Sequence, residues 1–237
     1  MEPSARFENV QIPLREPVHG LETVSGVLGM PEWWPTGSRV GIVLAHGSSG
    51  SQDDPLVAEL HRSLTERKYL TLRFNFPFAE AQKKRPDPPA VMERVLRAAI
   101  GVLGRDPTAA PAHLFVGGKG LGARVAADLA TGRPRVDGAF FLGYPLHAPG
   151  DAKQIRVEHL YRIVSPMLFL QGTRDKACDI DVLRKVLTRV GAPTTLQVVQ
   201  EADGQFKVPK KSGRTDAAVR EEMLALIDGW IHKTLGL

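Results

Sequence analysis

Apolar residues along this chain follow two alternating patterns. Short runs such as 39–45 and 136–142 are almost continuously apolar, which is typical of strands buried on both faces of a sheet. Between them lie longer stretches in which apolar residues recur every three to four positions, as on one face of a helix. These patterns predict strands at 7–12, 21–30, 39–45, 69–74, 113–116, 136–142, 166–170 and 194–199, and helices at 55–67, 90–103, 121–130, 179–190 and 215–234.

The alternation of strands and helices predicts an α/β fold with a doubly wound, mostly parallel sheet and helices on both faces. Residues 1–237 are expected to form a single domain, since the chain is long enough for one sizeable core and too short for two. No helix is expected between the first two strands, so residues 1–35 should form a hairpin and loop on the sheet edge. Gly20 is placed in the hairpin turn, and Trp33 and Trp34 are predicted to cover the edge.

Composition and charge exclude several classes of protein. The net charge is +5, but the basic clusters at 83–85 and 207–211 lack interleaved aromatic residues, so a nucleic-acid partner is not expected. Cys178 is the only cysteine, which rules out an internal disulfide and a cysteine metal cluster. A lone thiol fits a reducing compartment, so a cytoplasmic location is expected. No signal-like start and no membrane-spanning run is found, and neither a metal nor a cofactor is expected.

A glycine-rich turn, Gly118-Lys119-Gly120-Leu121-Gly122, separates a predicted strand from a predicted helix. One site with this shape is the nucleophile elbow, G-x-S-x-G, which raises a serine on a tight turn. Another is the dinucleotide-binding turn, G-x-G-x-x-G/A, which needs an acid at the end of the next strand, about twenty residues on. Here Asp137 begins the next strand instead of ending it, so the elbow is favoured, with glycine in place of serine.

Four loops at the carboxyl ends of predicted strands occur in the order that an α/β-hydrolase requires. The loop 46–50 stands where backbone amides form the oxyanion hole, and Gly120 stands where the nucleophile belongs. Asp175 follows a later strand, in the position of the catalytic acid. The loop around Asp203 and Gly204 follows the last strand, in the position of the catalytic histidine.

Several longer motifs carry a closer resemblance, and they extend from about residue 40 to the last helix. They are Leu-Ala-His-Gly at 44–47, Gly-Gly-Lys-Gly at 117–120, Leu-Gly-Tyr-Pro-Leu-His at 142–147, Phe-Leu-Gln-Gly-Thr-Arg-Asp at 169–175 and Ala-Asp-Gly-Gln-Phe-Lys at 202–207. With these motifs the chain resembles the small α/β-hydrolase-like family of testis-expressed protein thirty and the non-specific-lethal complex subunit three. It is more distantly similar to dienelactone hydrolases.

The resemblance implies that two members of the catalytic triad are replaced. The family has serine at the position of Gly120, and it has Asp-His-Ser-Phe where this chain has Asp-Gly-Gln-Phe at 203–206. Gly204 thus occupies the position of the general base, while Asp175 remains as the acid. Independently of the family, the chain has no histidine between His159 and His232. A hydroxyl without an adjacent base is a weak nucleophile near neutral pH.

The first functional hypothesis is a catalytically inactive pseudo-hydrolase that acts by binding a small molecule or a protein partner. The residues expected to bind the ligand are His46, Gly47, Ser48, Lys119, Leu121, Tyr144 and His147. Lys119 is included because a helix start attracts anions. The alternative is an esterase or dienelactone-type hydrolase with an unusual nucleophile, for which the candidates are Ser48, Ser49, Ser51 and Cys178. A third hypothesis is a dinucleotide-binding oxidoreductase.

Overall fold

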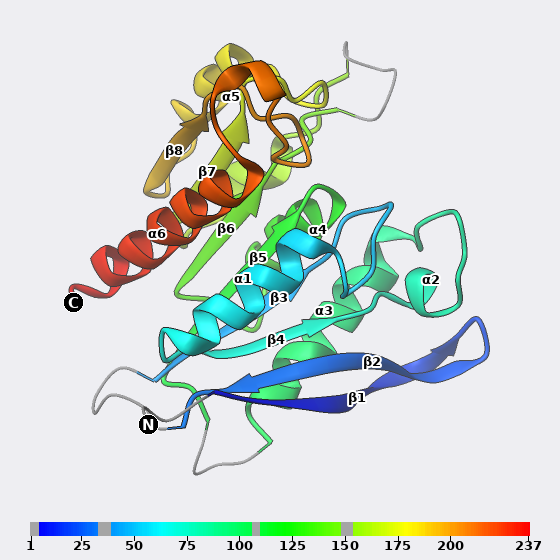
Figure 1. The fold of residues 1–237 in the computed structure, drawn as a ribbon. Helices are drawn as coiled ribbons and strands as arrows, with labels where there is room; N and C mark the ends of the chain where they lie inside the picture. The colour runs from blue at the N-terminus through cyan, green and yellow to red at the C-terminus, as the bar shows by residue number, and fades with distance from the viewer. Residues whose placement is uncertain (1–4, 33–38, 106–109, 148–153) are drawn as a thin grey trace.

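One eight-stranded sheet runs through the protein in the strand order β1-β2-β4-β3-β5-β6-β7-β8 (Figure 1). The structure is a computed structural model, and it describes residues 5–32, 39–105, 110–147 and 154–237. The strands are β1 (Arg6–Val18), β2 (Leu21–Met30), β3 (Val40–Ala45), β4 (Leu70–Phe74), β5 (His113–Lys119), β6 (Gly138–Leu142), β7 (Met167–Gly172) and β8 (Thr194–Val199). The β1–β2 and β2–β4 pairs are antiparallel, and the pairs from β4 to β8 are parallel.

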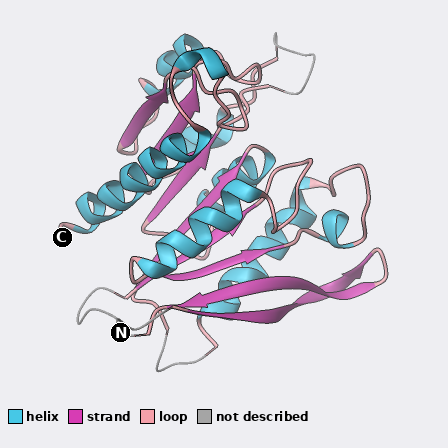
Figure 2. Ribbon diagram, viewed as in Figure 1, coloured by secondary structure: helices cyan, strands magenta, loops and turns pink. Residues whose placement is uncertain are grey.

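Helices cover both faces of the sheet, as Figure 2 shows. They are α1 (Pro55–Glu66), α2 (Pro77–Glu80), α3 (Pro89–Leu103), α4 (Leu121–Ala130), α5 (Ile180–Leu187) and α6 (Asp216–Leu235), with 3-10 turns η1 (Glu158–Arg162) and η2 (Lys210–Ser212). The cores on the two faces are separate: one contains the buried sides of α3, α4 and α5, and the other those of α1 and α6. The predicted doubly wound α/β fold is therefore confirmed.

Strand β3 is buried on both sides, which explains why its sequence lacks an alternating pattern of apolar and polar residues. All six of its residues are buried. Val43 and Ala45 contribute to the core on the α3–α4 face, and Ile42 and Leu44 to the core on the α1–α6 face. A strand between two helical layers buries both of its sides, so it needs apolar residues at every position.

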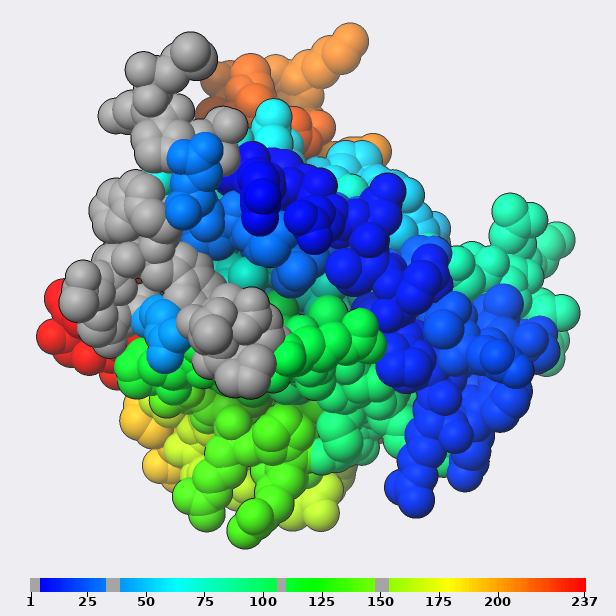
Figure 3. Space-filling view, turned by 90° about the horizontal axis from the view of Figure 1, so that it is seen from below, coloured from blue at the N-terminus to red at the C-terminus, as the bar shows by residue number. Residues whose placement is uncertain are grey.

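The predicted hairpin forms one edge of the sheet. His19 and Gly20 both adopt positive φ, 53° and 79°, in the turn that joins β1 to β2. Seen from below, in Figure 3, the blue hairpin lies along one side of the molecule, next to the green of α3. The predicted position of the tryptophan pair, Trp33 and Trp34, lies outside the described residues. None of the helices in the described parts of the chain has the length and hydropathy needed to cross a bilayer.

A few elements differ from the prediction. Strand β5 continues three residues beyond Val116, because β3 pairs with it up to Gly118 and β6 pairs with it up to Lys119. Strand β1 extends to Val18, although most of its residues are exposed. The short helix α2 lies within a predicted loop, where Phe78 is pinned by a hydrogen bond from its N–H to Asp87, 2.8 Å long. Tertiary contacts, which the local pattern does not contain, determine these three differences.

We predict that acid destabilises this fold through two buried histidines. Burial lowers the pKa of His61 and of His159 to about 4, and the positive charges of Arg73 and Arg124 respectively contribute to the two shifts. Below about pH 6.5 these histidines bind protons in the unfolded chain but not in the folded chain. The free energy of unfolding that the neutral histidines contribute is therefore complete above that pH and is lost as the pH falls towards 4. The loss is at most about 1.4 kcal/mol per pH unit for each histidine.

Urea unfolding at a series of pH values between about 7 and 5 measures this effect. The free energy of unfolding should fall over this range, and His159→Gln should reduce the slope. A free energy of unfolding that does not change with pH in the wild type would contradict the prediction. Replacing His61 by Gln as well should reduce the slope further.

Candidate functional site

Gly120 is the single residue between β5 and α4, and its backbone is folded as a nucleophile elbow. Its φ is 54° and its ψ is −113°. A residue with a side chain pays about 1–3 kcal/mol in such a sparsely populated region, whereas glycine adopts it freely. A Cβ at this position would have no atom within 4 Å. The turn would therefore project a side chain into open space, but Gly120 provides none.

Two other glycines of the turn are required by close packing. A Cβ on Gly118 would lie 2.3 Å from the backbone carbon of Gly122, and a Cβ on Gly122 would lie 2.5 Å from the carbonyl oxygen of Ala45. The start of α4 thus packs directly against the backbone at the end of β3. This contact places the segment that begins with His46 and Gly47 beside Gly120.

Lys119 lies beside Gly120 but is directed away from solvent. Its side chain is 6% exposed, and its Nζ lies 2.6 Å from Oδ2 of Asp54. The other oxygen of Asp54 accepts hydrogen bonds from the N–H groups of Leu56 and Val57 and so caps α1. Lys119 is predicted from the sequence to bind an anion, but in the structure its ammonium group is already paired with the nearly buried carboxylate of Asp54.

His46 is fully buried, and its ring holds the neighbouring loop in place. Its Nε2 accepts the N–H of Phe76 at 3.0 Å, so its proton is on Nδ1, which donates to the carbonyl oxygen of Gly47 at 2.8 Å. Burial lowers the pKa of His46 and keeps the imidazole neutral. Both ring nitrogens have partners, so His46 orders the loop in this structure.

Asp175 follows β7, where the catalytic acid of such a fold belongs. Its Oδ2 accepts a hydrogen bond from Nε2 of Gln171 at 2.6 Å, and its Oδ1 accepts the N–H of Ala177 at 2.8 Å. Gln171 is fully buried and also accepts the N–H of Tyr144 at 2.9 Å. A buried amide therefore fixes both the carboxylate and the start of the loop after β6.

Gly204 lies directly against this carboxylate. A Cβ at Gly204 would be 2.8 Å from Oδ1 of Asp175. The surrounding turn is well defined, because Oδ1 of Asp203 accepts the N–H groups of Gln205 and Lys207 and the ring of Phe206 is buried. The carboxylate of Asp175 thus faces a backbone position that carries no side chain.

The turn at Gly120 and the pair of Asp175 and Gly204 lie at the same edge of the sheet. The N–H of Gly120 donates to the carbonyl of Leu142 at the end of β6, and the N–H of Gly143 donates to the carbonyl of Leu170 in β7. Strands β5 and β7 are separated only by β6, which corresponds to roughly 10 Å. This is the carboxyl edge of the parallel strands, where α/β proteins bind their ligands.

Tyr144 was another expected ligand contact, but it is fully buried behind this edge. Its hydroxyl is hydrogen-bonded to Nε2 of His159, and burial raises the pKa of that hydroxyl. Its ring packs against Phe141 and Phe169. The structure therefore corrects its role: Tyr144 supports the loop after β6 and does not reach the solvent side.

The remaining candidates lie at or near the surface. Ser48 is exposed, and Leu121, the residue that follows Gly120, is half-buried. His147 lines a hollow of about 440 Å³ together with Asp175 and Cys178. The pKa of the Cys178 thiol is raised by burial and by the adjacent carboxylates of Asp175 and Asp179, which is the reverse of what a nucleophile needs. Within the described residues, no group of three or more His, Cys, Asp or Glu is arranged to hold a metal.

The structure also bears on the dinucleotide hypothesis. Asp137 precedes β6, and its carboxylate accepts the N–H of Leu114 at 2.8 Å, near the beginning of β5. It therefore lies at the opposite end of the strands from the Gly120 turn. An acid that binds a ribose would have to lie at the end of β6, near that turn.

Two residues of the site were missed from the sequence. Gln171 was read only as part of a motif, although a polar side chain at the end of an otherwise apolar strand indicates a buried hydrogen-bonding role. Asp54 caps α1, and its pairing with Lys119 was not foreseen. A lysine inside an apolar strand–turn–helix needs an acidic partner, and that requirement was the available signal.

Comparisons with known proteins agree with this geometry. Residues 38–232 match the family of alpha/beta hydrolase domains. The structure is similar to a dienelactone hydrolase from Anabaena variabilis, with 19% identity, a TM-score of 0.70 and coverage of 94% of this chain and 96% of that one. It is similar to XC6422 from Xanthomonas campestris, a serine hydrolase without a lid, with 19% identity, a TM-score of 0.69 and coverage of 94% and 95%. Est1E from Butyrivibrio proteoclasticus, solved with ferulic acid, has 15% identity, a TM-score of 0.69 and coverage of 92% and 99%.

We predict different costs for adding one methyl group to the three glycines of the turn. Gly118→Ala and Gly122→Ala would force a Cβ onto backbone atoms, so each should lower the free energy of unfolding by about 3 kcal/mol or more. The new Cβ of Gly120→Ala meets no atom. Its free energy of unfolding should therefore fall only by the cost of the strained backbone, about 1–3 kcal/mol. Chemical unfolding of the three variants provides the measurement. Equal losses at Gly118 and Gly120 would contradict the predicted packing.

We predict that the Lys119–Asp54 pair is essential for the stability of this edge. Lys119→Met leaves a carboxylate without its partner in a nearly dry environment, which typically costs about 3–5 kcal/mol. The matched control is the exposed pair of Arg184 and Asp181, whose loss should cost less than about 1 kcal/mol. Thermal and urea unfolding measure both variants. A loss at Lys119 as small as that at Arg184 would show that the pair is not essential.

Proposed function

Since the chain belongs to the alpha/beta hydrolase domain family, we propose that it is a pseudo-hydrolase that retains the frame of the active site and acts by binding. The observation that carries the proposal is the position of the Asp175 carboxylate against the bare backbone of Gly204. The acid is fastened in place, yet no imidazole occupies the position that it faces. A second group is also missing: the turn at Gly120 has the elbow conformation but carries no hydroxyl.

The chemistry of the triad supports inactivity. A serine hydroxyl attacks an ester only when a neighbouring base removes its proton, and the two groups act as a unit. Removing any member of a triad costs several orders of magnitude in rate. With nucleophile and base both replaced, a chain of this kind retains only backbone amides that can bind a polar group.

The resemblance to the family of testis-expressed protein thirty and the non-specific-lethal complex subunit three supports the same proposal. This resemblance implies that the positions of Gly120 and Gly204 carry serine and histidine in that family. The two departures affect the reacting groups and leave the supporting residues, including Gly118, Gly122 and Gln171. Loss of the reaction while the scaffold is retained accounts for this pattern.

The ligand is expected at the open side of the Gly120 turn, near exposed Ser48 and half-buried Leu121 and against the backbone of buried Gly47, with His147 on the neighbouring rim. A small molecule or a segment of a protein partner would bind there without being cleaved. We place this activity in the cytoplasm, because the lone thiol of Cys178 is buried and unpaired.

The test compares the wild type with Gly120→Ser, Gly204→His and the double variant, using a fluorophosphonate probe and p-nitrophenyl acetate. The wild type should show neither labelling nor turnover. Only the double variant should hydrolyse the ester, at a rate at least about 100-fold above either single variant, since a general base contributes about 10²–10⁴. A further change, Asp175→Asn, should remove most of this gain.

The control is Gly204→Ala, which tests whether Asp175 can move aside for a Cβ. The carboxylate of Asp175 is the end of a side chain and can shift, so the variant should still fold. Labelling of the wild type at Ser48, Ser49 or Ser51, or ester turnover that disappears with Cys178→Ala, would refute the proposal and support the esterase alternative.

A further inference from the structure

Strand β1 leaves its regular pairing with β2 near the hairpin end. The register runs without a break from Arg6 opposite Met30 to Pro13 opposite Thr23, and it then shifts before Val18 pairs with Leu21. Residues 14–17 thus form a bulged segment. Bulges of this kind are commonly retained for a purpose, because they redirect side chains away from the sheet.

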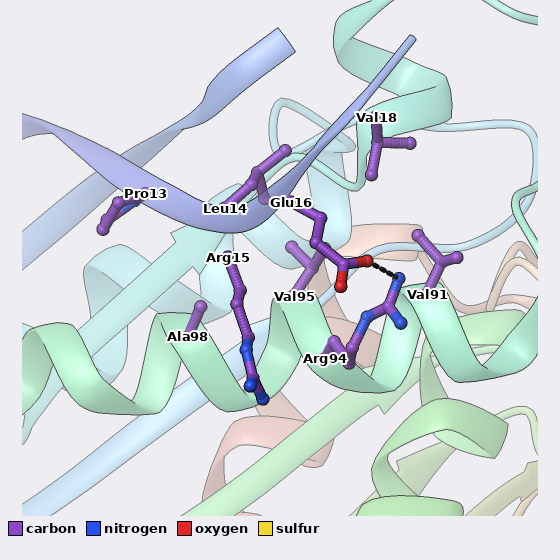
Figure 4. A pocket seen from close by; sticks show the side chains of 9 residues that line it. All are labelled: Pro13, Leu14, Arg15, Glu16, Val18, Val91, Arg94, Val95 and Ala98. Carbon is purple, nitrogen blue, oxygen red and sulfur yellow. Dashed lines mark ion pairs between the residues drawn. The ribbon is translucent and has the colours of Figure 1, made fainter. Parts of the chain in front are cut away.

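The bulged segment passes over helix α3 and leaves a hollow between the two. Its volume is about 240 Å³, just below the usual range for small-molecule sites, roughly 300–1,000 Å³. Its lining is largely apolar and includes Leu14 and Val18 from β1 and Val91, Val95 and Ala98 from α3 (Figure 4). Figure 4 shows β1 above the helix, with Val91, Val95 and Ala98 pointing up from α3. We call this hollow the β1–α3 groove.

Positive charge gathers at the rim of the β1–α3 groove. Arg15 extends from the strand towards the helix (Figure 4), and within the described residues it has no ion pair. Arg94 lies 3.6 Å from Glu16, but its side chain is 50% exposed and that of Glu16 is 66% exposed. Such an exposed pair is weak and is readily exchanged for another carboxylate.

We propose that the β1–α3 groove binds a small amphipathic carboxylate. The apolar body of the ligand would lie on Leu14, Val91 and Val95, and its carboxylate would pair with Arg15 and compete with Glu16 for Arg94. A single negative charge fits the rim, because the two arginines face one glutamate and leave one unit of positive charge. The volume limits the ligand to about the size of a medium-chain fatty acid or a short aromatic acid.

The β1–α3 groove is separate from the site at Gly120. Its residues come from β1 and α3, whereas that site is built from the loops that follow β3, β5, β6, β7 and β8. A ligand in the groove would therefore bind whether or not the chain is a pseudo-hydrolase. The two proposals can fail independently.

The experiment titrates octanoate into the whole protein, followed by calorimetry and by backbone amide NMR shifts. Saturable binding is expected with a Kd on the order of 1 mM or tighter. The shifts should be confined to β1 and α3. Octanamide, which has the same chain without the charge, should bind about tenfold more weakly.

Variants locate the site. Arg15→Gln should weaken octanoate binding about tenfold, and Arg15→Lys should restore most of it, because it returns the charge. Ala98→Leu should fill the groove and abolish binding while the folding temperature is unchanged or higher. Arg62→Gln, on the exposed side of α1, is the matched control and should leave binding unchanged.

The proposal is overturned if octanoate does not bind saturably, or if octanamide binds equally well. It is also overturned if Ala98→Leu folds and still binds, or if the NMR shifts lie at the Gly120 turn instead of at β1 and α3. This last result would place the carboxylate in the site of the pseudo-hydrolase.

Discussion

The close contact between the start of α4 and the end of β3 is the constraint on which the rest of the site depends. At Gly118 and Gly122 the backbones approach so closely that no side chain fits, and Ala45 is the neighbour on β3. This contact sets the position of α4 on the sheet and forces the sharp turn at Gly120. It also brings the loop of His46 beside that turn. Two of the three turn glycines are therefore structural, and only Gly120 is free of packing.

That difference explains how a reaction can be lost without loss of the fold. A serine at Gly120 would touch nothing and would hold a strained backbone, so glycine there relieves strain and disturbs no contact. Asp175 is in the opposite situation. Its carboxylate bonds Gln171 and Ala177 and so fastens the loop after β7, a task that is independent of catalysis. Under the proposed function, Asp175 is retained because it also stabilises the fold, whereas a residue at position 120 that served only the reaction could be replaced.

Elements whose burial is reflected in their local pattern of apolar residues were predicted well. The buried strand β3 and the strand β8 have nearly the predicted bounds. The differences arise where long-range contacts dominate. Helix α2 and the extension of β5 depend on partners far along the chain. The same holds for the site: the positions of Gly120, Asp175 and Gly204 were read from motifs, but the burial of His46, Lys119 and Tyr144 was not.

The sequence by itself determined the fold class, the order of the elements and the presence of glycine at positions 120 and 204. These follow from residue identity and from periodicity, which are local properties of the chain. Only the tertiary structure decided which side chains face solvent at that edge, because exposure depends on contacts between distant segments. Lys119 meets Asp54, His46 meets Phe76, and Asp175 meets Gly204 only once the sheet is assembled. The β1–α3 groove likewise exists only because a bulge in one element lies over another.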